Sequence, residues 1–176
     1  MGASDMISML GGGTADTLLM VFVSTLMGYV IGLPLGVCLT IFDADGISPH
    51  PWIYKLLDFV INITRSVPFL ILLILIQPFT KMLVGKSYGT TATIVPLTVA
   101  AAPFIARMVE SSLKEVDKGV IEAAVSLGAK KSTIVTKVLI AEARTSLLVG
   151  VTIALGTILG YSAMSGVVGG GGLGDI

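Results

Sequence analysis

The chain has 176 residues, of which 54% are hydrophobic and 12% are charged. A soluble domain usually carries about 25% charged residues, so this composition argues against one and favours a membrane protein. The 11 basic and 11 acidic residues cancel, so no excess of positive charge points to a nucleic-acid partner.

Four stretches without Asp, Glu, Lys or Arg are candidates for membrane spans, because about 20 apolar residues cross a bilayer. They are residues 17–42, 66–80, 87–106 and 145–174. The second is long enough only if it starts at Phe59, so the predicted spans are 17–42, 59–80, 87–106 and 145–168. We therefore predict an all-α, polytopic membrane helix bundle, preceded by an external segment over residues 1–16.

Glycines recur every four residues in the first span, at Gly28, Gly32 and Gly36. This spacing puts them on one helix face, where the backbone of a second helix can approach closely. Gly156 and Gly160 repeat the spacing in the last span and predict another packing surface. The alternative for the first set is that the glycines face lipid.

Prolines interrupt the middle of the chain, with Pro68 and Pro78 in the second span and Pro96 and Pro103 in the third. Because proline lacks an N–H and crowds the preceding turn, we expect kinked helices. Arg65 falls about two turns inside the second span, from where a long side chain can reach the membrane interface.

Metal and nucleotide chemistry finds little support in the sequence. Cys38 is the only cysteine and His50 the only histidine, so neither belongs to a set of metal ligands. We expect Cys38 to be a packing residue and His50 an ordinary loop residue. The chain also lacks a G-x-x-x-x-G-K-[ST] phosphate loop, so it is not expected to hydrolyse ATP or to hold a cofactor of its own.

Residues 107–144 form the longest connection between spans and are rich in charge. Together with residues 43–65 they contain nine of the basic residues, and the other two are Lys81 and Lys86. Cytoplasmic loops are enriched in Lys and Arg. This asymmetry predicts that the N-terminus lies outside and that the long connection is cytoplasmic.

Gly119 and Gly128 bracket a short helix within that connection. Glu122 near its start interacts favourably with the helix dipole, and apolar side chains at helical spacing form a slim face. That face consists of Val120, Ala124 and Leu127. Such a helix is suited to docking in a groove of another protein, and the alternative is a surface helix that lies on the bilayer.

The same helix carries a recognisable pattern, E-A-A-x3-G, followed by a cluster of apolar residues. The matching residues are Glu122, Ala123, Ala124, Gly128, Val138 and Ile140. This resembles the EAA loop of ABC importer permeases, E-A-A-x3-G-x9-I-x-L-P, with Ala141 where a proline usually stands. Three further stretches, 65–69, 94–110 and 160–176, resemble the methionine-importer branch of that family.

The resemblance implies the type I importer permease fold over residues 17–176, with residues 107–144 as the cytoplasmic coupling segment. It implies a homodimer in the bacterial inner membrane, two ATPase subunits that use ATP and Mg, and an external substrate-binding lipoprotein. The chain would be a translocation subunit rather than an enzyme. Because this branch has five spanning helices, the four spans here lead us to expect that a fifth is missing.

The resemblance also implies site residues and a substrate. Coupling to the ATPase is expected at Gly119, Glu122, Ala123, Ala124, Leu127 and Gly128. Tyr161 and Met164, with the kink residues Pro68 and Pro103, are candidates for the translocation pathway or gate, although Met164 is equally suited to packing. The expected substrate is methionine, both D- and L-. The alternatives are a permease for another amino acid or a short peptide, and a membrane assembly protein without transport activity.

Overall fold

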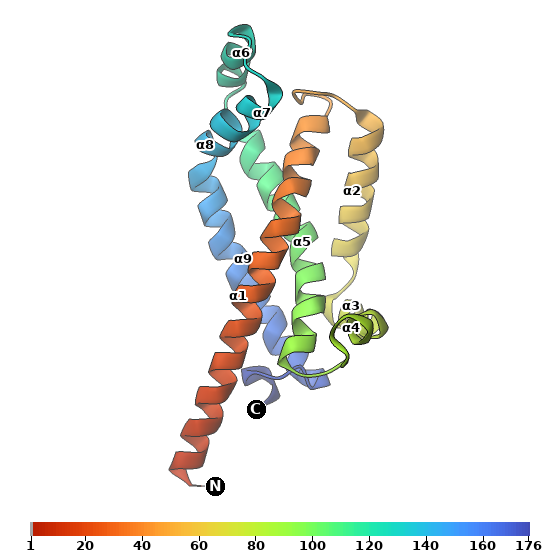
Figure 1. Ribbon diagram of the computed structural model, residues 1–176, viewed down its shortest axis with the longest axis vertical. Coiled ribbons are helices and arrows are strands. Elements are labelled where there is room, and N and C mark those ends of the chain that lie inside the picture. The colour runs from red at the N-terminus through yellow and green to blue at the C-terminus, as the bar shows by residue number, and fades with distance from the viewer. Residues whose placement is uncertain (1) are drawn as a thin grey trace.

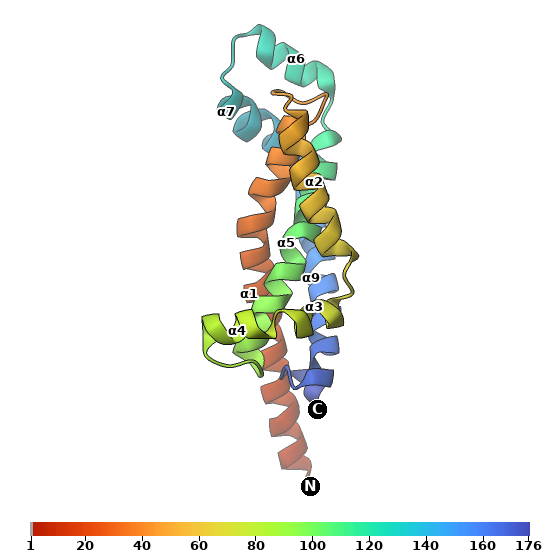
Figure 2. The same ribbon diagram turned by 90° about the vertical axis from the view of Figure 1, so that its right-hand side faces the viewer.

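The computed structural model describes residues 2–176, which form helices and no strands. Long helices α1 (Ala3–Phe42), α5 (Thr90–Lys114) and α9 (Arg144–Ser165) run along the molecule, and α2 (Pro51–Ser66) lies beside them (Figure 1). The short helices α3 (Phe69–Leu75) and α4 (Gln77–Val84) lie across this direction (Figure 2). The all-α prediction is confirmed.

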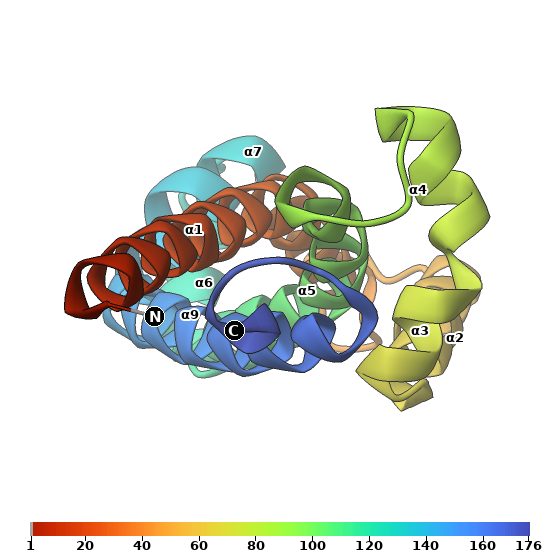
Figure 3. The same ribbon diagram turned by 90° about the horizontal axis from the view of Figure 1, so that it is seen from below.

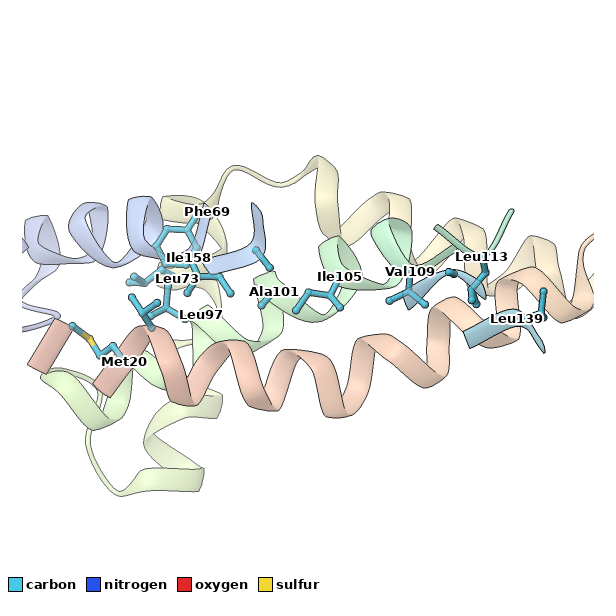
Figure 4. Close-up of a cluster of buried hydrophobic side chains, with 13 residues drawn as sticks. Met20, Phe69, Leu73, Leu97, Ala101, Ile105, Val109, Leu113, Leu139 and Ile158 are labelled. Atoms are coloured by element: carbon cyan, nitrogen blue, oxygen red, sulfur yellow. The ribbon is translucent and has the colours of Figure 1, made fainter. Parts of the chain in front are cut away.

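Helix α5 occupies the centre of the bundle. It contacts α1, α2, α3, α4 and α9, and seen along the bundle it lies between the α1–α9 pair and the α2–α3 pair (Figure 3). The core is a row of α5 side chains spaced four residues apart, which places them on one helix face. These buried residues are Leu97, Ala101, Ile105, Val109 and Leu113 (Figure 4).

The three glycines of α1 lie on the face that contacts α5. A Cβ atom added to Gly28 would lie 2.9 Å from Cδ1 of Ile105, and one added to Gly36 would lie 2.7 Å from Cβ of Val109. Neither separation leaves room for a side chain, so glycine is what allows the two backbones to approach. The four-residue spacing therefore marks a packing surface between helices rather than a lipid-facing one.

Gly156 and Gly160 do not pack in this way within the described residues, and the predicted packing surface on the last span remains a prediction. Both glycines are exposed on α9, and nothing in the described residues lies within 4 Å of a Cβ added to either one. The buried face of α9 instead presents Ala154 and Ile158 to the bundle. The glycine spacing indicates a smooth helix face without saying which neighbour covers it.

The predicted second span, 59–80, is not a single helix. Helix α2 begins earlier, at Pro51, and ends at Ser66, and α3 then leaves at an angle of 100°. Val67 is extended, with φ −79° and ψ 123°, because the ring of Pro68 disfavours a helical conformation in the preceding residue. A second break follows at Ile76, and Pro78 lies in the first turn of α4.

The other helices also differ from the predicted spans at their ends. Helix α1 begins at Ala3, so most of the segment 1–16 is helical. Helix α5 continues past residue 106 to Lys114, and it includes the buried Glu110. The prediction ended this span at the first charged side chain, but α5 accommodates these charges through ion pairs along the helix and with Asp58 of α2 and Asp43 just after α1.

Opposite ends of the bundle carry different structures (Figure 1). One end, here called the α6 end, is covered by α6 (Lys118–Ser126), α7 (Lys131–Thr133), the π-helix η1 (Ile134–Leu139) and α8 (Ile140–Glu142). The chain termini lie towards the other end. There η2 (Gly166–Val168) and η3 (Leu173–Asp175) follow α9, and the backbone N–H of Leu173 donates to Oγ1 of Thr17, 2.9 Å away.

Candidate functional site

Helix α6 is a short helix with a defined stop at each end. The carboxylate of Asp117 accepts a hydrogen bond from the backbone N–H of Gly119, 2.7 Å away, and so caps its start. At its other end Gly128 has φ +73°, a left-handed conformation that glycine adopts without steric cost. The N–H groups of Gly128 and Ala129 donate back to Val125 and Ala124, which is a Schellman motif.

No residue of α6 is buried in this chain. Leu127, at its end, is 88% exposed, and Val120 is 42% exposed. With Ala124, which is half-buried, these residues share one helix face, opposite the side of the helix that lines a hollow. An exposed apolar face on a helix held outside the bundle is suited to binding a partner protein.

The hollow separates α6 from the loop between α1 and α2 and has a volume of about 710 Å³. Lys118 and Glu122 of α6 line it, facing Asp43 and Asp45 of the loop. Nζ of Lys118 lies 2.8 Å from a carboxylate oxygen of Asp45, and this hydrogen bond raises the pKa of Lys118. Glu122 therefore lies on the side of α6 that faces the loop.

A second contact braces the segment that follows α6. Nζ of Lys131 donates to Oγ of Ser48, 2.9 Å away. His50, in the same loop, binds the carbonyl oxygen of Ser48 through Nδ1 and packs its ring edge against Phe42, so it is a loop residue with local contacts. The loop thus supports α6 at its start and the chain that leaves its end.

The apolar cluster after α6 lies in the π-helix η1 and in α8. Leu139 is buried in the core, whereas Val138 and Ile140 on either side of it are half-buried. Ala141 is exposed, and the helix continues through it to Glu142. This cluster anchors the segment that follows α6 to the end of α5.

A network of charged side chains connects α1, α2 and α5 at the α6 end. Arg107 of α5 pairs with Asp58 of α2 and, at 2.7 Å, with Glu110. Lys114 pairs with Glu110 at 2.8 Å and with Asp43, just after α1, at 2.6 Å. Every cation in this chain of contacts therefore has a carboxylate partner, and three helices are held together where α5 leads towards α6.

Asp43 lies outside the helices, and its ionisation contributes to this network. The hydrogen bond from Lys114 lowers the pKa of Asp43. A carboxylate with a lowered pKa stabilises the folded state above its ordinary pKa, and this contribution is lost as the pH falls through the lowered value. The connection between α1 and α5 is thus at full strength at neutral pH.

Glu110 is the group on which the network depends most, because it is only 4% exposed and joins both cations. Replacing it with Gln leaves Arg107 and Lys114 each short of one buried carboxylate partner, which should cost about 2 to 3 kcal/mol. Thermal unfolding of the purified protein in detergent would measure the loss. Glu115→Gln, at an exposed position just after α5, is the control, and equal unfolding midpoints for the two variants would contradict this role.

The structure places only some of the residues predicted to line the translocation pathway next to one another. The ring of Tyr161 stacks on Phe69 at a centroid distance of 4.7 Å, next to Pro68 at the start of α3. Met164 is 48% exposed on α9. Pro103 is buried in the middle of α5, so within this chain it packs in the bundle and does not line an open surface.

Spans, a kinked bundle and an exposed capped helix at one end are the features of a membrane transport component. Within the described residues, helices long and apolar enough to cross a membrane are Ser4–Phe42, Thr90–Lys114 and Arg144–Asp175, and the bent α2–α3 pair counts as a further span if taken as one. Residues 28–176 match the family described as the inner membrane component of binding-protein-dependent transport systems. The chain belongs to this family, and it is a multi-pass membrane subunit of a transporter rather than an enzyme.

The chain is similar to members of this family that are named for the substrate they transport. Over 163 residues the chain is 50% identical to the probable D-methionine transport system permease protein MetI of Vibrio cholerae, covering 93% of this chain and 72% of that one. It is also 50% identical over 154 residues to the D-methionine transport system permease protein MetI of Escherichia coli, covering 88% and 71%.

Solved structures give the same picture of the fold. An inward-facing conformation of the MetNI methionine ABC transporter superposes with a TM-score of 0.97 at 49% identity, covering all of this chain and 81% of that one. An amino acid ABC transporter described with histidines superposes with a TM-score of 0.78 at 24% identity. The second likeness extends the fold to a more distant relative.

Proposed function

We propose that this chain is the membrane-spanning subunit of an ATP-driven importer that carries methionine, in both its D- and L-forms, into the cell. The observation that carries the proposal is the likeness to the MetNI methionine ABC transporter, at a TM-score of 0.97 and 49% identity. Relatives at about the same identity are named as D-methionine permeases. We infer the substrate from this similarity to named relatives, because a fold alone does not fix a ligand.

Energy for transport comes, in this proposal, from two separate ATPase subunits that bind ATP and Mg. They dock on α6 and its ends, and the residues involved are Gly119, Glu122, Ala123, Ala124, Leu127 and Gly128. When ATP closes the ATPase pair, α6 moves and carries with it the α1–α2 loop and the end of α5, to which it is braced. The spans then rock between inward-facing and outward-facing arrangements.

The importer works as a homodimer of this chain with an external substrate-binding lipoprotein. The pathway runs between the two copies and is lined by the second to fourth spans, with Tyr161 and Met164 near its gate and Pro68 at the bend beside it. The exposed face of α9 that carries Gly156 and Gly160 is available for the second copy. Close approach there requires small residues, which those positions provide.

The protein lies in the bacterial inner membrane, with the α6 end in the cytoplasm and the N-terminus outside. Cysteines placed at Lys130 and at Lys86, in a background without Cys38, should then react with a membrane-impermeant reagent from opposite sides. Lys130 follows α6, and Lys86 lies in the loop before α5 at the other end of the bundle. Reaction of both positions from outside intact cells would refute the orientation.

Substrate identity is tested in cells that have lost their own methionine uptake. Expressed with its ATPase and lipoprotein, the chain should restore accumulation of labelled methionine. Unlabelled D- and L-methionine should compete with the label, whereas histidine and short peptides should not. Efficient competition by another amino acid or a peptide would make this a different permease, and no uptake of any amino acid or peptide would favour an assembly protein.

A further inference from the structure

Arg65, on α2, is a cation that has no anionic partner among residues 2–176. It is the penultimate residue of α2, its side chain is exposed, and its guanidinium lies over the ring of Phe104 at 5.8 Å from the centroid. None of the ion pairs formed by the described residues includes it. Contact with an aromatic face stabilises a cation only modestly.

The contact with Phe104 places this charge far from both ends of the bundle. At a rise of 1.5 Å per residue, Phe104 lies about 15 Å along α5 from Lys114 and about 21 Å from Thr90. Arg65 itself lies about 21 Å along α2 from Pro51. The sequence led us to expect that the side chain of Arg65 reaches the membrane interface. It remains instead at the depth of the middle of the bundle.

A neighbouring half-buried arginine, in contrast, has anionic partners within the chain. Arg107 lies one turn closer to the α6 end on the same side of α5, and it binds Asp58, Glu110 and Asn62. The carboxylates of this network are all engaged with Arg107 or Lys114. The described residues thus supply anionic partners for Arg107 but none for Arg65, which lies farther from the α6 end.

A lone cation at membrane depth is costly against lipid and marks a substrate or ion path. Arg65 is also next to the place where α2 stops, and extended backbone at Val67 follows it. Non-helical backbone at this depth is tolerated where it lines a water-filled cavity or is covered by protein, and broken helices of this kind form substrate sites in transporters. The stacked rings of Phe69 and Tyr161 begin just past the break.

We propose that the guanidinium of Arg65 binds the carboxylate of the amino-acid cargo as it passes through the membrane. The planar guanidinium forms two parallel hydrogen bonds to a carboxylate, and the aromatic rings beside the break contact the apolar side chain of the cargo. This inference rests on the proposed function, because it takes an amino acid as the substrate. In this inference Arg65, which takes no part in the charge network, holds the carboxylate of the cargo in position in the pathway.

The test uses the complete importer, with ATPase and lipoprotein, in proteoliposomes. Arg65→Met should lower ATP-driven uptake of labelled methionine by about tenfold or more, and Arg65→Lys should retain an intermediate rate because a single ammonium replaces the paired contact. Lys81→Met removes an exposed charge on α4 that has no ion pair in the described residues and is the control. The yield of assembled complex is measured for each variant.

A second readout locates the contact. A methionine analogue that carries a diazirine, illuminated during turnover, should label peptides containing Phe69, Phe104 or Tyr161 in the unaltered importer and in Lys81→Met. This labelling should fall about tenfold in Arg65→Met. Should Arg65→Met fail to assemble, Arg65→Lys carries the same test.

The outcomes separate the two proposals. Two results would overturn the role of Arg65 but leave the proposed function standing. In one, the unaltered importer takes up methionine but these peptides are not labelled. In the other, Arg65→Met shows the same labelling and uptake as the unaltered importer. Loss of assembled complex in both Arg65 variants would show a structural role and overturn it as well. No methionine uptake by the unaltered importer would instead contradict the proposed function.

Discussion

Ala124→Arg is expected to abolish ATP-driven methionine uptake while leaving the amount of inserted protein unchanged. Ala124 lies on the face of α6 opposite the hollow and is half-buried, and no residue of this helix is fully buried in the chain, so the inserted protein should still form its bundle. A partner groove that fits alanine would have to hold a long side chain and an unpaired charge, which costs several kcal/mol when desolvated. Uptake in proteoliposomes should therefore fall below about a tenth of the unaltered rate.

Ser126→Arg is the matched control for this variant, because it places the same side chain on the same helix but on the side that lines the hollow. It should retain most of the uptake. Equal rates for both variants and the unaltered protein, at equal protein levels, would mean that α6 is a surface element without a coupling role.

Gly32→Leu is expected to prevent assembly of a stable bundle. A Cβ atom at Gly32 would lie 2.6 Å from the backbone oxygen of Ala102 and 2.9 Å from Cβ of Ile105. Backbone atoms cannot move aside as a flexible side chain can, so α1 and α5 would have to separate along their length. Overpacking of this kind costs about 3 kcal/mol or more, and the yield of monodisperse protein after detergent extraction should show it.

Gly12→Leu introduces the same side chain into the same helix and is the control. Nothing in the described residues lies within 4 Å of a Cβ atom at Gly12, so its yield should remain close to that of the unaltered protein. If Gly32→Leu gave the same yield, the contact between α1 and α5 would be looser than the structure describes.

Several features of the fold could be predicted because they follow from local chemistry. Glycines spaced four residues apart indicated the α1 face that packs on α5, and the two proline positions indicated where the second span breaks. Gly128 was predicted to mark the end of a short helix, and it does so with φ +73°. In each case one residue type has a steric property that holds in any context.

Other features depend on contacts between distant parts of the chain, and the sequence does not reveal them. The charge of Arg107 ended the predicted third span at residue 106, yet Asp58, on another helix, pairs with Arg107 and α5 continues. Asp117 was not identified as the cap of α6, although aspartate is a preferred residue at the start of a helix. Nor does the pattern of Gly156 and Gly160 say whether the covering helix belongs to this chain.

Arg65 illustrates the same limit for the candidate site. Its position in an apolar stretch is visible in the sequence, but its depth and its lack of a carboxylate partner become apparent only when α2 is placed against α5. A resemblance to a family identifies residues that belong to a motif. A charge outside the motif can be interpreted only from its surroundings.

Uptake by a fully defined preparation tests the central claim most directly. Proteoliposomes that contain this chain and its ATPase, with the lipoprotein and labelled methionine on one side and ATP and Mg with the ATPase on the other, should accumulate methionine above its external concentration. Replacing ATP with ADP should stop the accumulation. Methionine that entered equally well without ATP, or that did not enter at all, would contradict an ATP-driven methionine importer.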